Sequence, residues 1–132
     1  MIVLKLDLTP AANQLDRMHR WKITRLKRKW RRDLITQYLM LGKGIPLANG
    51  FRKLEVIRYS SNICDKDNLY RAAKPIIDTL KGVRGTGHLS GWIVDDSPKH
   101  INLICSWEKC AGHGWVEIRI TDPLEKEEET NE

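Results

Sequence analysis

The chain is organised around residues 65–96, which open with DKDNLYRAAKPIIDTL at positions 65–80 and close with WIVDD at positions 92–96. Two pairs of carboxylates, Asp65 with Asp67 and Asp95 with Asp96, lie at the ends of this stretch in a chain that is basic elsewhere. A hard divalent cation such as Mg²⁺ takes oxygen ligands, among them one or two protein carboxylates. Such an ion activates water for phosphodiester hydrolysis. The stretch therefore favours a metal-dependent reaction on phosphate esters.

Between the two acidic pairs, residues 67–81 have the period of an amphipathic helix. Its predicted packing face consists of Leu69, Ala73, Ile76 and Leu80. A separate stripe along one helix face collects Asp67, Arg71, Lys74 and Asp78. An interior proline costs about 3 kcal/mol, so Pro75 predicts a helix that either kinks there or restarts at Lys74. A flexible loop is expected at the glycines that follow, Gly82, Gly85, Gly87 and Gly91.

The flanking segments alternate between strand and helix patterns. Apolar residues at period two predict strands over residues 2–8, 53–59, 101–105 and 115–120, and a helical period covers residues 15–41. Gly112 and Gly114 predict a hairpin turn between the last two strands. The expected fold class is α/β, a small mixed sheet in the order strand, helix, strand, helix, strand, strand. Residues 1–122 form one domain, and residues 123–132 are expected to be an acidic, disordered tail.

The charge balance favours a polyanionic partner. The chain of 132 residues has a net charge of +6, and residues 1–122 alone carry 22 basic and 12 acidic side chains. Such a charge attracts nucleic acid or acidic lipid. The three cysteines, Cys64, Cys105 and Cys110, are expected to be reduced thiols in the cytoplasm of a bacterial or phage-infected cell. A signal peptide is not predicted, because the apolar residues from Met1 to Leu8 alternate with Lys5 and Asp7 and form too short and too charged a segment. A membrane span is not predicted, because no apolar run approaches about 20 residues.

Residues 15–41 predict an amphipathic helix with a strongly basic side. The apolar face is expected to consist of Ile23, Leu26, Trp30, Leu34, Tyr38 and Leu41. The opposite side carries a basic stripe of Lys22, Arg25, Arg28, Lys29 and Arg32. A solvated helix face explains such a stripe equally well in isolation, but its density favours contacts to DNA phosphates. Trp21 and Trp30 are candidates for stacking on unpaired bases, although packing in the core or a dimer interface is the commoner use of tryptophan.

The acidic residues also have purely structural explanations. Asp67 is well placed to cap the helix that follows it, and Asp95 and Asp96 precede Ser97 and Pro98 as turn residues do. The two pairs together are harder to explain this way, because they lie at element boundaries on both sides of one helix. A zinc site of cysteine and histidine is disfavoured, since the spacing between Cys105 and Cys110 fits no CxxC pattern.

With these residues in view, the chain resembles the RusA-type Holliday junction resolvases, small phage and prophage endonucleases. The resemblance covers residues 2–121. It rests on Asp65, Lys66, Asp67, Asn68, Leu69, Lys74, Pro75, Asp78, Thr79, Leu80, Val94, Asp95 and Asp96. It extends to Pro10 and Asn13, which follow the first predicted strand and precede a basic helix.

The resemblance implies a homodimeric, Mg²⁺-dependent enzyme that cuts four-way DNA junctions by paired nicks. It assigns the metal ligands to Asp65, Asp67 and Asp96, with Asp95 beside the last. It assigns catalysis to Asp65, Asp67, Asp96 and a lysine, which aligns with Lys74, with Arg71 as second choice because the spacing here is three residues longer. It implies DNA contacts from Asn13, the basic stripe and Arg71.

Two alternatives stay open at this point. A nuclease of the same fold that acts on other branched DNA has the same residues. A non-catalytic basic DNA-binding protein has the same charge, and its aspartates serve as caps and turns. Metal-dependent cleavage that is lost when Asp67 or Asp96 becomes Asn distinguishes an enzyme from a binding protein.

Overall fold

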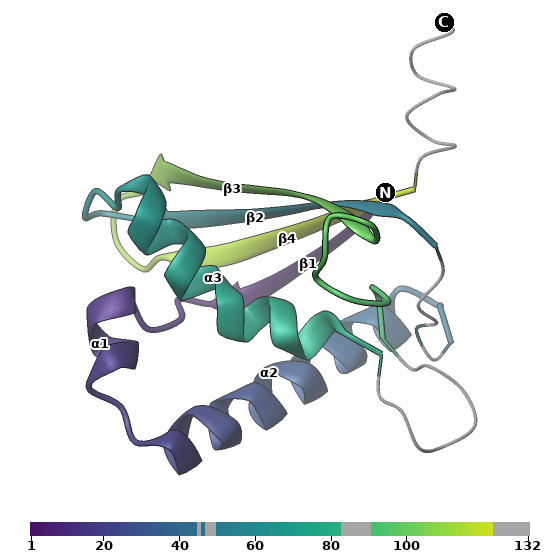
Figure 1. The fold of residues 1–132 in the computed structure, drawn as a ribbon, viewed down its shortest axis with the longest axis horizontal. Coiled ribbons are helices and arrows are strands. Elements are labelled where there is room, and N and C mark those ends of the chain that lie inside the picture. Colours follow the sequence, from purple (N-terminus) through teal and green to yellow (C-terminus); the bar gives the residue numbers. More distant parts are fainter. Residues whose placement is uncertain (45, 47–49, 83–90, 123–132) are drawn as a thin grey trace, which may run out of the picture.

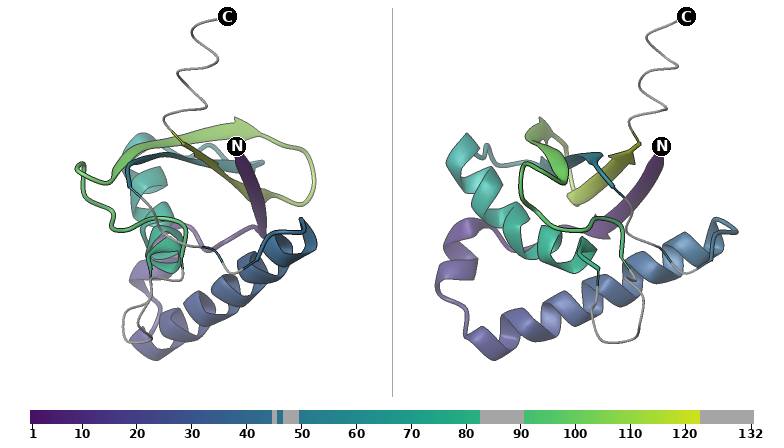
Figure 2. Two further views of the ribbon diagram at one scale, coloured as in Figure 1. Left: turned by 90° about the vertical axis from the view of Figure 1, so that its right-hand side faces the viewer. Right: turned by 45° about the vertical axis from the view of Figure 1, so that its right-hand side comes forward.

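In the computed structural model, which describes residues 1–44, 46, 50–82 and 91–122, helices cover one face of a four-stranded sheet (Figure 1). The elements are β1 (Ile2–Asp7), α1 (Ala12–Asp16), α2 (Arg20–Met40), β2 (Arg52–Ser60), α3 (Lys66–Leu80), β3 (Ile101–Lys109) and β4 (Trp115–Thr121). Both long helices, α2 and α3, lie on the same side of the sheet, as the turned views in Figure 2 show. The predicted α/β class is confirmed, and so is the alternation of strands and helices.

The strands lie in the order β1-β4-β2-β3, so the sheet is mixed as predicted. β2 pairs with β3 in parallel and with β4 in antiparallel orientation, and β4 pairs with β1 in antiparallel orientation. The predicted hairpin between the last two strands is wrong. The chain instead crosses the end of β2 to reach its other edge, and Gly114 lies at this crossing. A Cβ atom on Gly114 would lie 2.3 Å from the Tyr59 carbonyl oxygen. Only glycine, which has no Cβ atom, avoids this clash.

The core lies between the sheet and the two long helices. Alternate residues of the central strands, such as Leu54 of β2 and Ile118 of β4, are fully buried. They pack with Leu34 of α2 and Ile76 of α3 in one apolar cluster. Trp92, from the segment after α3, is fully buried in the same cluster. The core therefore fixes α2, α3 and the segment that begins at Gly91 against one another.

The single helix expected over residues 15–41 is two helices. α1 ends at Asp16, and α2 begins only at Arg20, because His19 has an extended backbone (φ −66°, ψ 146°). The short α1 contacts α3, whereas α2 packs on β1 and α3, so the chain changes direction between them. Trp30 and Leu34 are buried as predicted, but Leu41 is 56% exposed. Leu41 lies just beyond the last residue of α2, next to Leu39 and Met40, which are exposed as well.

α3 is one helix from Lys66 to Leu80 with Pro75 inside it, so the predicted restart at Lys74 is wrong. The predicted packing face is buried, and Ala72 and Ile77 are buried beside it. Burial of these side chains against the sheet offsets the backbone hydrogen bond that proline lacks. The N-cap is Asp65, whose carboxylate accepts a hydrogen bond from the Asn68 backbone N–H at 2.9 Å. The predicted cap, Asp67, is therefore wrong, because the residue that caps α3 lies two positions earlier.

Two predictions concern segments outside the described residues. Gly85 and Gly87 of the predicted loop lie there, as does the acidic tail of residues 123–132. Among the helices that the structure describes, none has the length and apolar character needed to cross a membrane.

Candidate active site

The second half of α3 and the segment that follows it bring together the carboxylates and lysines of a candidate active site. Lys74, Asp78 and Lys81 follow one another at steps of four and three residues, which places them on one side of the helix end. The segment carrying Asp95 and Asp96 is tied to this end by backbone hydrogen bonds, including Trp92 N–H to the Leu80 carbonyl at 2.8 Å. These hydrogen bonds place residues that are far apart in sequence beside each other.

Gly91 makes this close approach feasible. A Cβ atom at this position would lie 2.6 Å from the Lys81 carbonyl oxygen and 2.7 Å from the Gly82 nitrogen, both of them backbone atoms that cannot move aside easily. The chain can therefore turn back onto the end of α3 only with glycine at position 91.

We call Asp78, Asp95, Asp96, Lys74 and Lys81 the carboxylate–lysine cluster. The Lys81 ammonium lies 3.4 Å from Asp78, 3.7 Å from Asp95 and 3.3 Å from Asp96. The Lys74 ammonium contacts Asp96 and lies 3.3 Å from Asp78. Three carboxylates thus gather around one ammonium group, and a second ammonium joins two of them.

The basic helix α2 reaches this cluster through Lys27. Its ammonium donates a hydrogen bond of 3.1 Å to the Asp78 carboxylate. The neighbouring Arg31 donates to the carbonyl oxygens of Thr79 and Lys81 at 3.0 and 3.1 Å. These contacts hold α2 alongside the C-terminal half of α3. The basic stripe of α2 and the carboxylates of the cluster are therefore parts of neighbouring elements.

The contacts in the cluster keep Asp78 and Asp96 ionised and Lys74 protonated. The hydrogen bond from Lys74 holds the pKa of Asp96 well below its usual range, with smaller contributions from Asp95 and Lys81. Burial acts to raise the pKa of Asp78, but the hydrogen bond and charge of Lys27 and the charge of Lys74 lower it overall. The hydrogen bond to Asp96 raises the pKa of Lys74. Lys74 is consequently a permanent cation at neutral pH and not a base.

The predicted ligands Asp65 and Asp67 lie at the other end of α3. Asp65 is the N-cap, and both of its oxygens accept from Asn68, at 2.9 Å from the backbone and 3.3 Å from the side chain. Asp67 lies in the first turn and is exposed. At a rise of about 1.5 Å per residue, Lys74 is roughly 10 Å further along the helix than Asp67. The structure thus brings together Asp95, Asp96 and Lys74 of the predicted site but not the first acidic pair.

The two candidates for the catalytic cation point to different neighbours. Lys74 contacts Asp96 within the carboxylate–lysine cluster. Arg71 instead contacts Asp16 of α1 and donates a hydrogen bond of 3.4 Å to Asn68. The hydrogen bond and charge of Asp16 raise the pKa of Arg71. This geometry favours Lys74 for a role beside the carboxylates and leaves Arg71 near α1.

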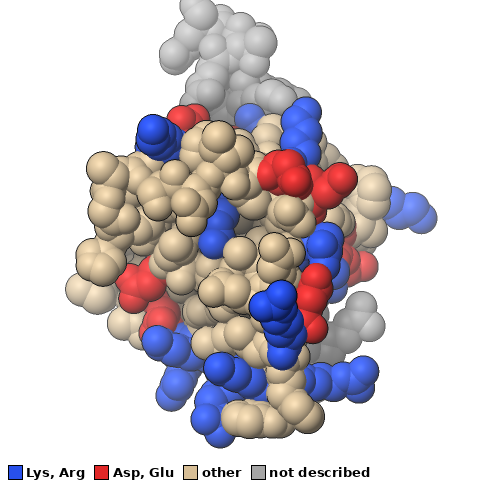
Figure 3. All heavy atoms as spheres, turned by 90° about the vertical axis from the view of Figure 1, so that its left-hand side faces the viewer, with Lys and Arg blue, Asp and Glu red and all other residues tan. Residues whose placement is uncertain are grey.

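The predicted DNA-contacting residues of α2 lie on its outer surface. All five residues of the basic stripe are exposed: Lys22, Arg25, Arg28, Lys29 and Arg32. Lys and Arg side chains gather along the lower edge of the molecule in Figure 3, where α2 lies. Trp21 is 55% exposed near the start of α2, and the Arg25 guanidinium lies 4.9 Å from its ring centre. Trp30, by contrast, is buried, so it packs in the core and is not available for stacking on bases.

Three members of this site were not predicted from the sequence as site residues: Asp78, Lys81 and Lys27. Asp78 did show a signal, because it falls on the same helical stripe as Lys74. Lys81 follows it by three residues and lies at the end of the same face. Lys27 had no such signal, since it belongs to another helix and its contact with Asp78 depends on how α2 packs against α3.

The donor set of the cluster suits a hard cation in its chemistry. Asp78, Asp95 and Asp96 offer only carboxylate oxygens, the ligands that Mg²⁺ prefers. They surround an ammonium at 3.3 to 3.7 Å, a wider spacing than the Mg²⁺–oxygen distance of about 2.1 Å. In the described part of the chain, no group of three or more His, Cys, Asp or Glu side chains has the spacing of a formed metal site. Metal binding here therefore requires these carboxylates to move closer together.

The comparisons with known proteins leave the site to be judged by its geometry. No protein-family model matches the chain, and a search of curated proteins gives no match. The resemblance to RusA-type resolvases therefore stays a prediction from the acidic motif.

Proposed function

We propose that this chain is a Mg²⁺-dependent, structure-selective endodeoxyribonuclease that resolves four-way DNA junctions by paired nicks in DNA recombination and repair. The observation that supports it most is the carboxylate–lysine cluster, in which three carboxylates and two lysines lie beside a basic helix. Phosphodiester cleavage needs oxygen ligands for a cation and positive charge for the phosphate at the same place. The cluster offers both. A cytoplasmic location is part of the proposal.

In this proposal Asp96 would hold the ion, with Asp95 and Asp78 beside it. Asp78 and Asp96 are ionised at neutral pH, because the lysines beside them lower the pKa of each carboxyl group. When bound, Mg²⁺ polarises a phosphoryl oxygen and lowers the pKa of water. Asp65 and Asp67 stay predictions as ligands, and the Asp67→Asn variant tests this end of α3.

Lys74 acts as an electrostatic group and not as a proton acceptor. Its ammonium is already directed at the carboxylates, and its raised pKa keeps it charged at neutral pH. A fixed cation beside a phosphate stabilises the negative charge that grows in the transition state, and removal of one such group typically costs about 100-fold or more in rate. Lys81 contacts Asp78, Asp95 and Asp96, and it would have to give way for these carboxylates to hold an ion.

The exposed basic stripe of α2 holds the DNA backbone. Its five side chains are solvent-accessible, and α2 is joined to the cluster by the contact of Lys27 with Asp78. Contacts to phosphates position a nucleic acid without selecting its sequence. Selection of a branched structure then depends on the shape of the DNA. Paired nicks need two sites, so the proposal includes a homodimer with two-fold symmetry.

One observation favours a second candidate, a non-catalytic DNA-binding protein. Each carboxylate of the cluster already has a lysine partner, and Asp65 is engaged as a helix cap. In that case the cluster ties the segment of residues 91–96 to α3, and the basic stripe carries the whole function.

The deciding experiment incubates the full chain with a labelled synthetic four-way junction, a linear duplex and a flap, with and without Mg²⁺. Asp67→Asn, Asp78→Asn and Asp96→Asn are compared with Asp33→Asn, which changes an exposed aspartate of α2 in the same way. We expect symmetric, Mg²⁺-dependent nicks on the junction, lost in Asp96→Asn and kept in Asp33→Asn. Loss of cleavage in Asp78→Asn but not in Asp67→Asn places the metal in the carboxylate–lysine cluster.

The reverse pattern, with loss only in Asp67→Asn, places the metal at the start of α3 and contradicts the assignment to the cluster. Cleavage of the flap in preference to the junction identifies a nuclease of another branched DNA. Tight junction binding with no cleavage of any substrate supports the DNA-binding protein instead.

A further inference from the structure

Arg58 of β2 is a buried arginine outside the carboxylate–lysine cluster. It lies on the helix-facing side of the sheet and is only 8% exposed. Leu54 and Val56 precede it on this side and are buried in the core. An apolar side chain would continue this pattern. The arginine therefore needs an explanation from its surroundings.

In the part of the chain that the structure describes, the guanidinium has no acidic partner. Within the described residues its side chain makes one hydrogen bond, from Nη1 to Thr9 Oγ1 at 3.4 Å, and no ion pair. Burial lowers the pKa of Arg58, and the nearby Cys64 thiol is the other group that acts on it. A buried charge without a counter-ion costs several kcal/mol in general. An anion that enters from solvent offsets this cost.

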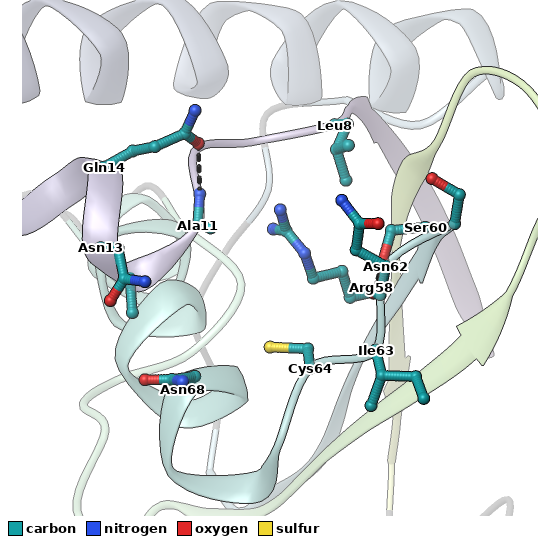
Figure 4. Close-up of a pocket in the computed structure, with 12 residues that line it drawn as sticks. Leu8, Ala11, Asn13, Gln14, Arg58, Ser60, Asn62, Ile63, Cys64 and Asn68 are labelled. Atoms are coloured by element: carbon teal, nitrogen blue, oxygen red, sulfur yellow. Dashed lines mark hydrogen bonds between the residues drawn. The ribbon is translucent and has the colours of Figure 1, made fainter.

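The Arg58 side chain points into a cavity of about 350 Å³ between α1, the start of α3 and the end of β2 (Figure 4). None of the described residues that line this cavity is Asp or Glu. Asn13 and Asn62 contribute side-chain amides to its wall, and Leu8 and Ile63 contribute apolar surface. The end of the molecule that carries α1 faces the viewer in Figure 3. The middle of this face is largely uncharged, with a basic group recessed in it.

Among the described residues, none of the acidic groups near this cavity forms an ion pair with Arg58. The Asp65 carboxylate caps α3 and accepts from Asn68. Asp7 and Asp33 line a neighbouring hollow that Arg58 also borders, but among the residues described neither forms an ion pair with Arg58, whose side chain bonds to Thr9. The cavity is thus electropositive at its base and lined by neutral hydrogen-bonding groups.

We propose that this cavity binds a phosphate group, with the Arg58 guanidinium as its principal ligand. The planar fork of arginine matches two phosphate oxygens, which makes arginine the usual partner for this anion. The volume exceeds that of one phosphate, so the group can enter while attached to a sugar. The binding itself does not depend on the proposed nuclease activity. Only the source of the phosphate, a DNA strand, rests on that proposed function.

The position of the cavity suits a strand that also passes the carboxylate–lysine cluster. Asn68 lines the cavity, and Lys74 of the same helix belongs to the cluster. Six residues of helix separate them, or about 9 Å. A DNA strand advances about 3.4 Å per nucleotide. A phosphate in the cavity therefore lies roughly three nucleotides from one at the cluster.

The first test measures thermal unfolding of the full chain in inorganic phosphate against sodium chloride of equal ionic strength. At phosphate tenfold above its Kd, the midpoint of the native protein is expected to rise by about 5 °C. The Arg58→Gln variant should not respond to phosphate. Without phosphate it should unfold at or above the native temperature, because it lacks a buried unpaired charge. Arg17→Gln, the same change at an exposed arginine near α1, should respond as the native chain does.

Arg58→Lys keeps the charge and loses the planar fork, so its phosphate Kd should be about tenfold weaker than that of the native chain. This variant also provides the test if Arg58→Gln does not fold. The proposal is overturned if the native midpoint ignores phosphate, if Arg58→Gln keeps the full response, or if Arg58→Lys binds phosphate as tightly as the native chain.

Two dinucleotides identify the source of the phosphate. Thymidine dinucleotide has one internal diester, and its 5′-phosphorylated form adds a terminal monoester. Equal Arg58-dependent binding of both indicates a site for the strand backbone, whereas binding of the phosphorylated form alone indicates a strand end. The results also separate this inference from the proposed function. If the native chain cleaves DNA and Asp96→Asn does not, but phosphate does not raise the midpoint, only phosphate binding in the cavity is refuted. If phosphate raises the midpoint but no DNA is cleaved, only the nuclease activity is refuted.

Discussion

Replacement of Asp96 by Asn removes one negative charge from the carboxylate–lysine cluster and keeps the size of the side chain. In the native protein the Asp96 carboxylate contacts Lys74 and lies 3.3 Å from Lys81, and its side chain is 25% exposed. Exposed ion pairs contribute under about 1 kcal/mol, whereas hydrogen bonds to charged groups contribute about 1.5–3 kcal/mol. For a site that keeps some contact with water, we expect the variant to lose about 1.5 kcal/mol of unfolding free energy at neutral pH.

This loss corresponds to a measurable change in melting temperature. A chain of 132 residues has an unfolding entropy of about 0.28 kcal/mol per kelvin. The midpoint should therefore fall by roughly 5 °C. Circular dichroism at pH 7 measures it, with Asp33→Asn as the matched control because Asp33 is exposed on α2.

The pH dependence separates the charge of Asp96 from its shape. Its pKa in the folded protein lies below the ordinary value of 3.8, so its stabilising effect is present above about pH 4 and is lost as the pH falls further. The pKa of Lys74 lies above its ordinary value of 10.5. The stability that its charge contributes is therefore present below that pH and is lost as the pH rises further. The variant and the native protein should therefore converge in stability below pH 4.

Two results refute this reasoning. One is an unchanged melting temperature in Asp96→Asn at pH 7, which means that the ion pairs contribute nothing measurable. The other is a constant difference between variant and native protein from pH 7 to pH 2, which means that the effect does not come from the ionised carboxylate.

Three further predictions concern other parts of the molecule. Gly91→Ala should unfold at a lower urea concentration than the native chain, because its Cβ meets the Lys81 carbonyl at 2.6 Å, whereas Gly44→Ala, with open space around it, should not. Leu34→Ala should cost about 2–5 kcal/mol in urea unfolding, since Leu34 is fully buried, and a cost below 1 kcal/mol contradicts the assigned core. Arg28→Gln should weaken junction binding and reduce the slope of log K against log salt by about 1, and an unchanged slope removes this exposed arginine from the phosphate contacts.

Much of the fold was predictable because it depends on local periodicity. Apolar residues at period two gave the four strands, and the helical period gave the packing face of α3, which is buried throughout. The break between α1 and α2 was not predictable, since neither Gly nor Pro marks it and it follows from packing of α1 on α3. The hairpin failed for a related reason: a glycine-rich turn shows where the chain bends but not which strand edge it reaches.

The candidate site was predictable in part for the same reason. The carboxylates at both ends of α3 and the lysine on its exposed stripe are visible in the sequence, and Asp96 and Lys74 do meet. Their shared neighbour Asp78 was visible as a position on that stripe but not as a member of the site. Asp67 lies on the same stripe, but two helical turns before Lys74. The helical period of the sequence shows which residues share a face, but it does not show at which turn of α3 the segment with Asp95 and Asp96 docks.

The sequence by itself determined which residues face the core, where the charges lie and that a basic helix accompanies an acidic motif, because burial and charge follow from residue type and spacing. Only the tertiary structure decided that β4 inserts between β1 and β2, that Lys27 reaches Asp78 and that Arg58 faces a cavity whose described lining is uncharged apart from Arg58 itself. These relations join residues far apart in the chain. Their free energies depend on distance and desolvation, and both are set only when the helices pack on the sheet.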